Sequence, residues 1–164
     1  SARSSVNMTV KWDGAPAIFA GTDPSDGKFF VAKKSVFNVN PKLYKSNKEI
    51  DDDVSGDLNA KFKVALKEFS KLGIKGVLQG DLMFTDDLGK ATIDGKKYYT
   101  FQPNTIVYAV DIDSDLGQKI KSAKIGVVWH TTYTGKDLPS MKAKFGADIK
   151  GFTQTSSVWM DDAS

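Results

Sequence analysis

The sequence contains no cysteine, one histidine and one arginine. The lack of cysteine excludes disulfide bonds, cysteine nucleophiles and zinc sites built from cysteine. His130 alone cannot make a histidine-rich metal site, and we expect it to be a structural residue. Because Arg3 is the only arginine, an arginine finger or another bidentate guanidinium has almost no candidate in this chain. Any phosphate contacts must therefore come from lysines or backbone N–H groups.

Long apolar segments are also absent, so we expect no membrane-spanning segment and no membrane partner. Residues 1–14 hold no apolar stretch of signal-peptide length, and we expect a cytoplasmic protein. Hydrophobic residues make up 40% and charged residues 26% of the 164 positions, as in a soluble globular domain. We therefore expect a single domain over residues 1–164, taken as a monomer. The net charge of +3 does not by itself indicate a polyanionic partner.

The pattern of apolar and turn-forming residues predicts an α+β fold with antiparallel sheets and helices packed outside them. Pro16 puts its strand at a sheet edge or at a bulge, and residues 85–96 are expected to form a loop. Residues 8–20 are predicted to form a strand, a tight bend and a second strand, followed by a turn at 21–28. Further strands are predicted at residues 29–35, 76–84, 97–102, 105–112 and 124–132. Helices are predicted at residues 57–72, 113–122 and 139–145, and the rest of the C-terminal segment is left unassigned.

The first candidate for chemistry is the segment Lys11-Trp12-Asp13-Gly14, at the end of an apolar strand and just before a bend. Shielding by Trp12 would desolvate the lysine and lower its pKa, which makes the amine a usable nucleophile. Asp13 can orient that amine or a bound group, and Gly14 lets a ligand approach the backbone closely. The alternative is an ordinary surface Lys-x-Asp pair before a turn.

The second candidate is the segment 28–48, which contains lysines and aromatic residues but no acid. Lysines can neutralise phosphates while exposed aromatic rings stack on bases, so the segment is typical of a nucleic-acid groove. In the alternative reading, the aromatic residues belong to the core and the lysines only keep the surface soluble. The lysines are Lys28, Lys33, Lys34, Lys42, Lys45 and Lys48.

The third candidate is a pair of acids, Asp81 and Asp111, each within a strand of apolar residues that should be buried. A buried carboxylate is costly unless it has a cation, a metal or a hydrogen-bond donor as partner. Lys11 and Lys34 are available partners, and Mg²⁺ held by carboxylates and nucleotide phosphates is another. An ordinary buried salt bridge remains the simpler alternative.

Taken in order, these segments resemble the covalent nucleotidyltransferases, which comprise ATP-dependent DNA and RNA ligases and mRNA capping enzymes. The four matching segments span about residues 8–112, and the chain is also similar to ligase-like proteins of tailed bacteriophages. The segments are Lys11–Gly14, the basic element Lys33-Lys34-Ser35, Gly80-Asp81-Leu82-Met83, and the aromatic strand Val107–Ile112.

The resemblance implies an adenylation domain that uses ATP and Mg²⁺ and acts on nucleic-acid ends. Lys11 would attack the α-phosphate and carry AMP, which then passes to a 5′-phosphate. Asp81 would lie near the ribose or the metal, and Lys34 near phosphate. The implied nucleotide-binding residues are Trp12, Asp13, Gly14, Lys34, Asp81, Tyr108 and Asp111, and the implied nucleic-acid contacts are Lys33, Lys34, Lys42 and Lys45.

The chain also departs from that family. Pro16 stands where ligases usually carry Arg or Asn, Asp81 replaces a longer Glu, and Val110 replaces an aromatic residue, leaving Tyr108 to stack on adenine. The late acid-Gly and Lys-x-Lys strands are missing: residues 125–128 lack the acid, and residues 142–144 fall in a predicted helix. We therefore expect an incomplete C-terminus. The alternatives are a non-catalytic nucleic-acid-binding module and a phage structural domain that kept only the scaffold.

Overall fold

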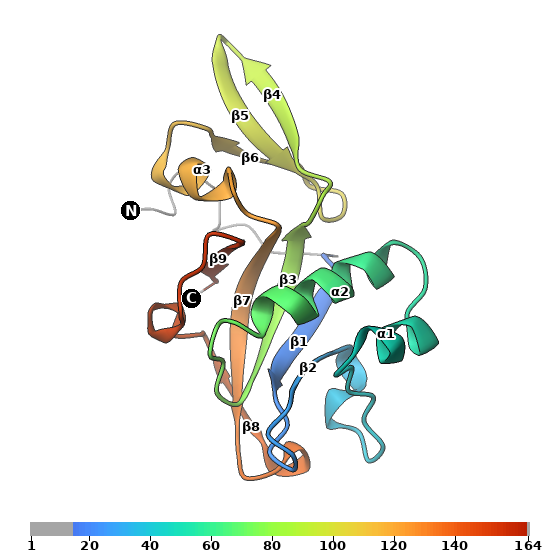
Figure 1. Ribbon diagram of the computed structural model, residues 1–164. Coiled ribbons are helices and arrows are strands. Elements are labelled where there is room, and N and C mark those ends of the chain that lie inside the picture. Colours follow the sequence, from blue (N-terminus) through green and yellow to red (C-terminus); the bar gives the residue numbers. More distant parts are fainter. Residues whose placement is uncertain (1–14, 164) are drawn as a thin grey trace.

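The computed structural model describes residues 15–163 and contains one large and one small β-sheet (Figure 1). In the large sheet β9 runs parallel to β7 and every other pair is antiparallel, so the α+β prediction is confirmed, with one parallel pair added. β8 and β9 share the same edge of β7, each along one half of it. The strand order is β2 (Phe29–Ala32), β1 (Ala17–Thr22), β3 (Val77–Phe84), β7 (Ile125–Thr134) and β8 (Lys142–Phe145), with β9 (Val158–Asp162) beside β7.

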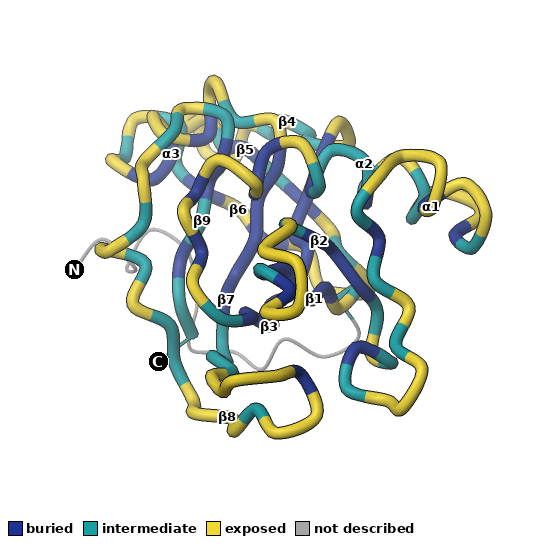
Figure 2. The backbone as a smooth tube through the Cα atoms, turned by 60° about the horizontal axis from the view of Figure 1, so that its bottom comes forward, coloured by how far each residue is buried: buried dark blue, intermediate teal, exposed yellow. Residues whose placement is uncertain are grey.

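Helix α2 (Asp57–Phe69) lies across one face of this sheet (Figure 1), as its apolar period predicts. Phe62, Ala65 and Phe69 are fully buried on that face, where the ring of Phe69 meets that of Trp129 with centroids 5.1 Å apart. Figure 2 shows the central strands buried along most of their length, while the connecting loops are exposed. Burial of the apolar face of α2 therefore fixes which side of each strand faces the helix.

Helix α1 (Asn47–Asp53) was not predicted, although the sequence carries a signal for it. The Ser46 hydroxyl accepts a hydrogen bond from the backbone N–H of Glu49, the capping arrangement typical of a Ser-x-x-Glu sequence. This Ser-x-x-Glu sequence starts at Ser46, inside the segment 28–48. The lysines and aromatic residues of that segment led us to expect a nucleic-acid groove there, and not a helix.

The small sheet consists of β4 (Gly89–Ile93), β5 (Lys96–Phe101) and β6 (Tyr108–Asp111), and α3 (Asp115–Ile120) follows it. The predicted pairing of β5 with β6 is confirmed, whereas the loop predicted at residues 85–96 is wrong because it contains β4. Asp94 and Gly95 join β4 to β5 with φ angles of 50° and 80°. A two-residue Asp-Gly turn is a strong hairpin signal, since both central residues of a type I′ turn need positive φ.

Three further predictions need correction. Pro16 does not mark an edge strand, because β1 begins only at Ala17 and lies between β2 and β3, with the Pro16 carbonyl accepting from the Leu82 N–H at 2.9 Å. The strand predicted at 29–35 ends at Ala32, and a 3₁₀ turn, η2 (Lys34–Phe37), follows it. The helix predicted at 139–145 is wrong as well, because β7 offers an edge that residues 142–145 pair with as a strand.

The remaining short elements are the 3₁₀ turns η3 (Leu138–Ser140) and η4 (Ile149–Gly151), which flank β8. The segment left unassigned at the C-terminus supplies η4 and β9. Across residues 15–163, no helix combines the length and the apolar character needed to cross a membrane.

Candidate functional site

The segment with the predicted nucleophile, Lys11, together with Trp12, Asp13 and Gly14, lies outside the described residues. The described chain begins at Ala15 and leads directly into β1. The first residue of β1, Ala17, pairs with Asp81 of β3. The chain that follows Lys11 therefore enters the large sheet beside one of the two predicted carboxylates.

Asp81 lies in an interior strand, with β1 on one side and β7 on the other. Side chains alternate along a strand, so Leu78 and Leu82 face α2 and Asp81 faces the opposite side of the sheet. The residue is only 8% exposed. The prediction that Asp81 is a buried acid in an apolar strand is confirmed.

No lysine in the described part of the chain pairs with Asp81, and the titratable side chain beside it is His130. The His130 Nε2 atom lies 3.8 Å from the Asp81 Oδ2 atom, and His130 Nδ1 is 2.8 Å from the Thr131 hydroxyl. Burial raises the pKa of the Asp81 carboxyl to about 7 and lowers the pKa of the His130 imidazole. Both neutral forms are thereby favoured, so near neutral pH this pair can accept or release a proton.

His130 reaches Asp81 because of an irregularity in the sheet that sequence reasoning missed. Gln79 and Gly80 of β3 pair with Thr131 and Trp129 of β7, so His130 is the extra residue of a bulge. A bulge redirects a side chain and often lies beside a functional site. Strand alternation alone does not reveal this bulge, so the sequence analysis did not link His130 with Asp81.

The register places a second acid on the same face as Asp81. Val128 of β7 pairs with Asp81 on one side and with Asp161 of β9 on the other, and both acids are 8% exposed. Sequence reasoning missed Asp161 because its strand was unassigned. Within residues 15–163, no three histidine or acidic side chains converge closely enough to hold a metal ion by themselves.

Polar and aromatic side chains continue this face away from Asp81. The Tyr133 hydroxyl donates to Gln79 Oε1 at 2.7 Å, and burial raises the pKa of Tyr133. The Tyr133 ring also contacts Phe37, with centroids 4.5 Å apart, and Phe19, at 6.0 Å. Together with Asp81 and His130, these residues form one face of the sheet, opposite α2, which we call the Asp81 face.

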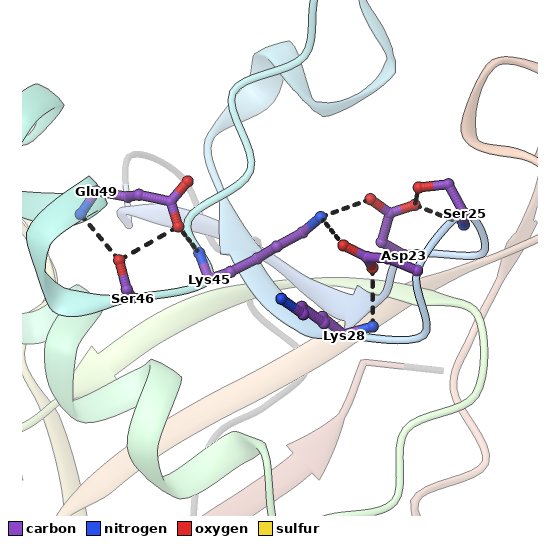
Figure 3. A network of polar contacts seen from close by, with 7 residues as sticks. Asp23, Ser25, Lys28, Lys45, Ser46 and Glu49 are labelled. Atoms are coloured by element: carbon purple, nitrogen blue, oxygen red, sulfur yellow. Dashed lines mark hydrogen bonds and ion pairs between the residues drawn. The ribbon is translucent and has the colours of Figure 1, made fainter.

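The lysines predicted to contact nucleic acid are not one basic surface. Lys42 pairs with Asp53 at 2.8 Å, and Tyr44 forms a short hydrogen bond with the same carboxylate. Lys45 pairs with Asp23 at 2.8 Å and with Asp26 at 2.7 Å (Figure 3). The acid-free segment 28–48 therefore folds against acids from other segments. These ion pairs balance the charge of Lys42 and Lys45, and the contact of the two lysines with nucleic acid stays a prediction.

Lys33 and Lys34 have no acidic partner within ion-pair distance in the described part of the chain. Lys33 precedes η2, and Lys34 is its first residue and is exposed. The structure thus does not bring Lys34 to Asp81 as an ion-pair partner, and the proposed pairing of Asp81 with Lys34 is wrong.

Asp111 and Tyr108 lie in the small sheet, apart from the strands that carry Asp81. Asp111 is partly exposed and pairs with Lys96 at 3.1 Å, rather than with Lys11 or Lys34. The Asp113 backbone N–H and the Lys96 ammonium hold the pKa of Asp111 below its usual value. Tyr108 is 5% exposed and its ring stacks on that of Phe101 at 5.6 Å, so a neighbouring ring already covers one of its faces.

The late segments of the family pattern both form strands. Residues 125–128 belong to β7 and are buried, as expected for a core strand. Lys142-Ala143-Lys144 forms most of β8, a strand rather than the predicted helix. Lys144 pairs with Thr132 and lines a pocket with Leu78, so it lies on the side of α2 and not on the Asp81 face.

The chain matches a family of unknown function, DUF6267, over residues 1–164. No curated protein and no solved structure matches it.

Proposed function

The chain belongs to the DUF6267 family, and we propose that it is an adenylyltransferase related to ATP-dependent polynucleotide ligases, acting in the cytoplasm through Lys11. One observation carries the proposal: Ala17, six residues after Lys11, pairs with the buried carboxylate Asp81. Six residues span at most about 20 Å, so the Lys11 amine can reach the Asp81 face. The strand that follows the Lys11–Gly14 segment in the sequence thus lies beside the strand that carries Asp81.

In the proposed reaction the Lys11 amine attacks the α-phosphorus of ATP. A nitrogen–phosphorus bond forms, the bond from that phosphorus to the bridging oxygen breaks, and pyrophosphate leaves. The amine must lose a proton to attack, and an acceptor works best when its pKa lies near the working pH. Asp81, whose pKa burial raises to about 7, matches that requirement, and His130 lies next to it.

The second half of the proposal concerns the fate of AMP. A nucleic-acid 5′-phosphate would attack the phosphorus of the lysyl–AMP, which restores the free amine. A 3′-hydroxyl would then displace AMP and seal the strand. The neutralised state of Lys42 and Lys45 argues against those lysines as the main contacts for the nucleic acid.

Mg²⁺ is the cation that the resemblance implies, and the residues present fit it in part. Mg²⁺ prefers oxygen ligands and is usually held by one or two carboxylates together with substrate phosphates. Asp81 would supply one buried carboxylate, and it would then be ionised and not the proton acceptor, so the two roles are alternatives; Asp161 lies on the same face across Val128. A bound Mg²⁺ would offset phosphate charge and assist the departure of pyrophosphate.

Incubation with ATP labelled at its α-phosphate tests the proposal. We expect label that stays with the denatured protein and is released by acid, as a phosphoramidate is. Lys11→Ala should lose the label entirely, while Lys119→Ala, an exposed lysine on α3, should keep it. Asp81→Asn should label more slowly by about 10²-fold or more, the usual contribution of a proton acceptor.

Two outcomes would contradict the proposal: label that survives in Lys11→Ala, or no label on the natural chain in the presence of Mg²⁺. Salt-sensitive oligonucleotide binding without any label would instead favour a non-catalytic nucleic-acid-binding module. Neither label nor binding would favour a scaffold that retains the fold alone.

A further inference from the structure

The family resemblance leaves Tyr108 to stack on the base of the nucleotide, but Tyr108 is buried in the structure. Its side chain is 5% exposed, and its ring stacks on that of Phe101 with centroids 5.6 Å apart. Tyr108 also belongs to the small sheet, apart from the strands that carry Asp81. A base that is bound beside Asp81 therefore needs a different ring.

Phe145, at the end of β8, places an exposed ring on the Asp81 face. It pairs with Thr131 of β7, which in turn pairs with Gln79 of β3. Directly paired residues point to the same side of a sheet and side chains alternate along β3, so all three residues face the same side as Asp81. The Phe145 ring is 67% exposed, and it is the one exposed aromatic residue within residues 15–163. A ligand that stacks on this ring would remove apolar surface from water.

Gln79 supplies an oriented hydrogen-bond donor in the same row of the sheet. Its Oε1 atom accepts from the Tyr133 hydroxyl at 2.7 Å. The Tyr133 ring is held in turn by the rings of Phe37 and Phe19, at centroid distances of 4.5 and 6.0 Å. The Gln79 NH₂ group has no acceptor among the described residues, and the side chain is partly exposed. A fixed amide whose oxygen is already occupied offers its two N–H donors to a ligand without a large cost in conformational entropy.

The geometry of the sheet sets the space between the ring and the amide. Neighbouring strands lie about 4.8 Å apart, so the Cα atoms of Phe145 and Gln79 are about 10 Å apart across β7. Thr131 lies between them, with its hydroxyl 2.8 Å from His130 Nδ1. Asp81 is two residues further along β3 than Gln79, which is about 7 Å. The space is wide enough for a nucleobase, and Asp81 lies at the distance where a ribose and its phosphates follow the base.

We propose that Phe145 and Gln79 bind the base of the nucleotide on the Asp81 face, an inference that rests on the proposed function because ATP is its substrate. The base stacks on the Phe145 ring, and the Gln79 NH₂ group donates to a ring nitrogen on the edge of the base. The phosphates then extend toward Asp81, which Ala17 and the chain that follows Lys11 adjoin. Few polar groups at fixed positions beside an apolar surface are the usual means of orienting a small ligand.

Binding of α,β-methylene ATP to the natural chain tests this base site without the covalent step. In this analogue a carbon bridge replaces the oxygen whose bond to the α-phosphorus the proposed reaction breaks. Calorimetry with the analogue and with inorganic tripolyphosphate, which has no base, separates base contacts from phosphate contacts. We expect Phe145→Leu to weaken binding of the analogue by about fivefold or more, the effect of losing a stacking partner. Gln79→Leu should weaken it by about fivefold, the effect of losing one hydrogen bond.

Tyr133→Phe tests whether the amide is held in place for the ligand. The variant keeps the ring between Phe37 and Phe19 and loses the hydroxyl that orients Gln79. We expect binding of the analogue to weaken by about twofold. Ile93→Ala is the matched control for Phe145→Leu, because Ile93 is also a large apolar residue, 53% exposed, but lies in the small sheet. It should bind the analogue as the natural chain does.

Three results would overturn the base site. They are an unchanged affinity for the analogue in either Phe145→Leu or Gln79→Leu, an equal loss of affinity for tripolyphosphate in these variants, and no binding of the analogue to the natural chain. The proposed reaction is judged separately by the label at Lys11. If Phe145→Leu takes label from ATP with an unchanged KM, the base site is wrong and the reaction stands. If the analogue binds through Phe145 but the natural chain never takes label, the base site stands and the reaction is wrong.

Discussion

Asp81 in the large sheet and Asp111 in the small sheet are both carboxylates on apolar strands, but their surroundings differ. Asp81 lies in an interior strand, is 8% exposed and has His130 beside it. Asp111 ends a four-residue strand, is partly exposed and pairs with Lys96. Burial raises the pKa of Asp81 to about 7, whereas the Asp113 N–H and Lys96 lower the pKa of Asp111. The interior position of β3 buries Asp81, whereas the end of β6 leaves Asp111 accessible to Lys96 and to the Asp113 N–H, and these surroundings set the two opposite pKa shifts.

The difference in burial also decides which of the two carboxylates is suited to proton transfer. A carboxylate paired with a lysine in solvent remains charged and stabilises little. A carboxylate that burial keeps partly protonated near neutral pH costs stability and is available for proton transfer. Asp81 and not Asp111 is therefore the better candidate for a functional group.

The first way to sharpen the comparison is to add one methyl group to each sheet. In Gly80→Ala the new Cβ would come within 2.7 Å of the Val128 carbonyl and of the Trp129 ring. In Gly89→Ala the nearest atom is the Thr100 hydroxyl at 2.7 Å, the end of a side chain that can rotate away. We expect Gly80→Ala to lower the free energy of unfolding by about 3 kcal/mol and Gly89→Ala by under about 1 kcal/mol.

Urea unfolding followed by circular dichroism measures both values. Similar losses in the two variants would mean that the large sheet is no more tightly packed than the small one. The conclusion that Asp81 lies in rigid, tightly packed surroundings would then be wrong as well.

The fold was largely predictable where local patterns agree with the final packing. The period of α2, the apolar run of β3 and the pairing of β5 with β6 each follow from residues close in sequence. The strand formed by residues 142–145 was not predictable in this way, because these residues become a strand by pairing with the edge of β7. The parallel pairing of β9 depends on the same edge and is equally non-local.

The second prediction concerns the pH dependence that a buried Asp81 imposes. Its pKa is higher in the folded chain than the usual value near 4, so the folded state binds more protons between about pH 4 and pH 7. The stability contributed by protonated Asp81 is therefore lost as the pH rises through that range. Asp81→Asn removes this loss, and we expect the variant to be more stable at about pH 8 by about 2 kcal/mol.

Urea unfolding of both proteins at several pH values checks this expectation. His130 acts in the opposite direction, because burial lowers its pKa and its contribution rises with pH up to about 6.5. With Asp81 replaced, the rising trend of His130 should remain. If both proteins lose stability equally between about pH 4 and pH 7, Asp81 is not the group responsible.

The candidate site was only partly predictable for the same non-local reasons. Asp81 stood out because an acid in an apolar strand needs a partner. His130 could not be assigned to it, because the bulge that redirects its side chain is a property of two paired strands. The lysines of segment 28–48 appeared unpaired along the sequence, and only the fold brings Asp23 and Asp53 to Lys45 and Lys42.

The third prediction, with the smallest effect, applies the same substitution to the small sheet. In Asp111→Asn the amide oxygen can still accept from the Asp113 N–H, so mainly the charge facing Lys96 is lost. Because the pKa of Asp111 is lowered on folding, its contribution is present above about pH 4 and is lost as the pH falls below that value. We expect Asp111→Asn to be slightly less stable than the natural chain at about pH 7 and equal to it at about pH 2.

The two substitutions should therefore have opposite signs at neutral pH: a gain at Asp81 and a small loss at Asp111. Urea midpoints of the natural chain and of Asp111→Asn, compared at low and high salt, test the second part. A solvent-exposed ion pair is screened, so the difference should shrink at high salt. The expectation would be contradicted if Asp111→Asn were more stable than the natural chain, or if its loss of stability did not shrink at high salt. Asp111 would then behave as a buried acid like Asp81, and the positions of the two strands would not explain a difference between the two acids.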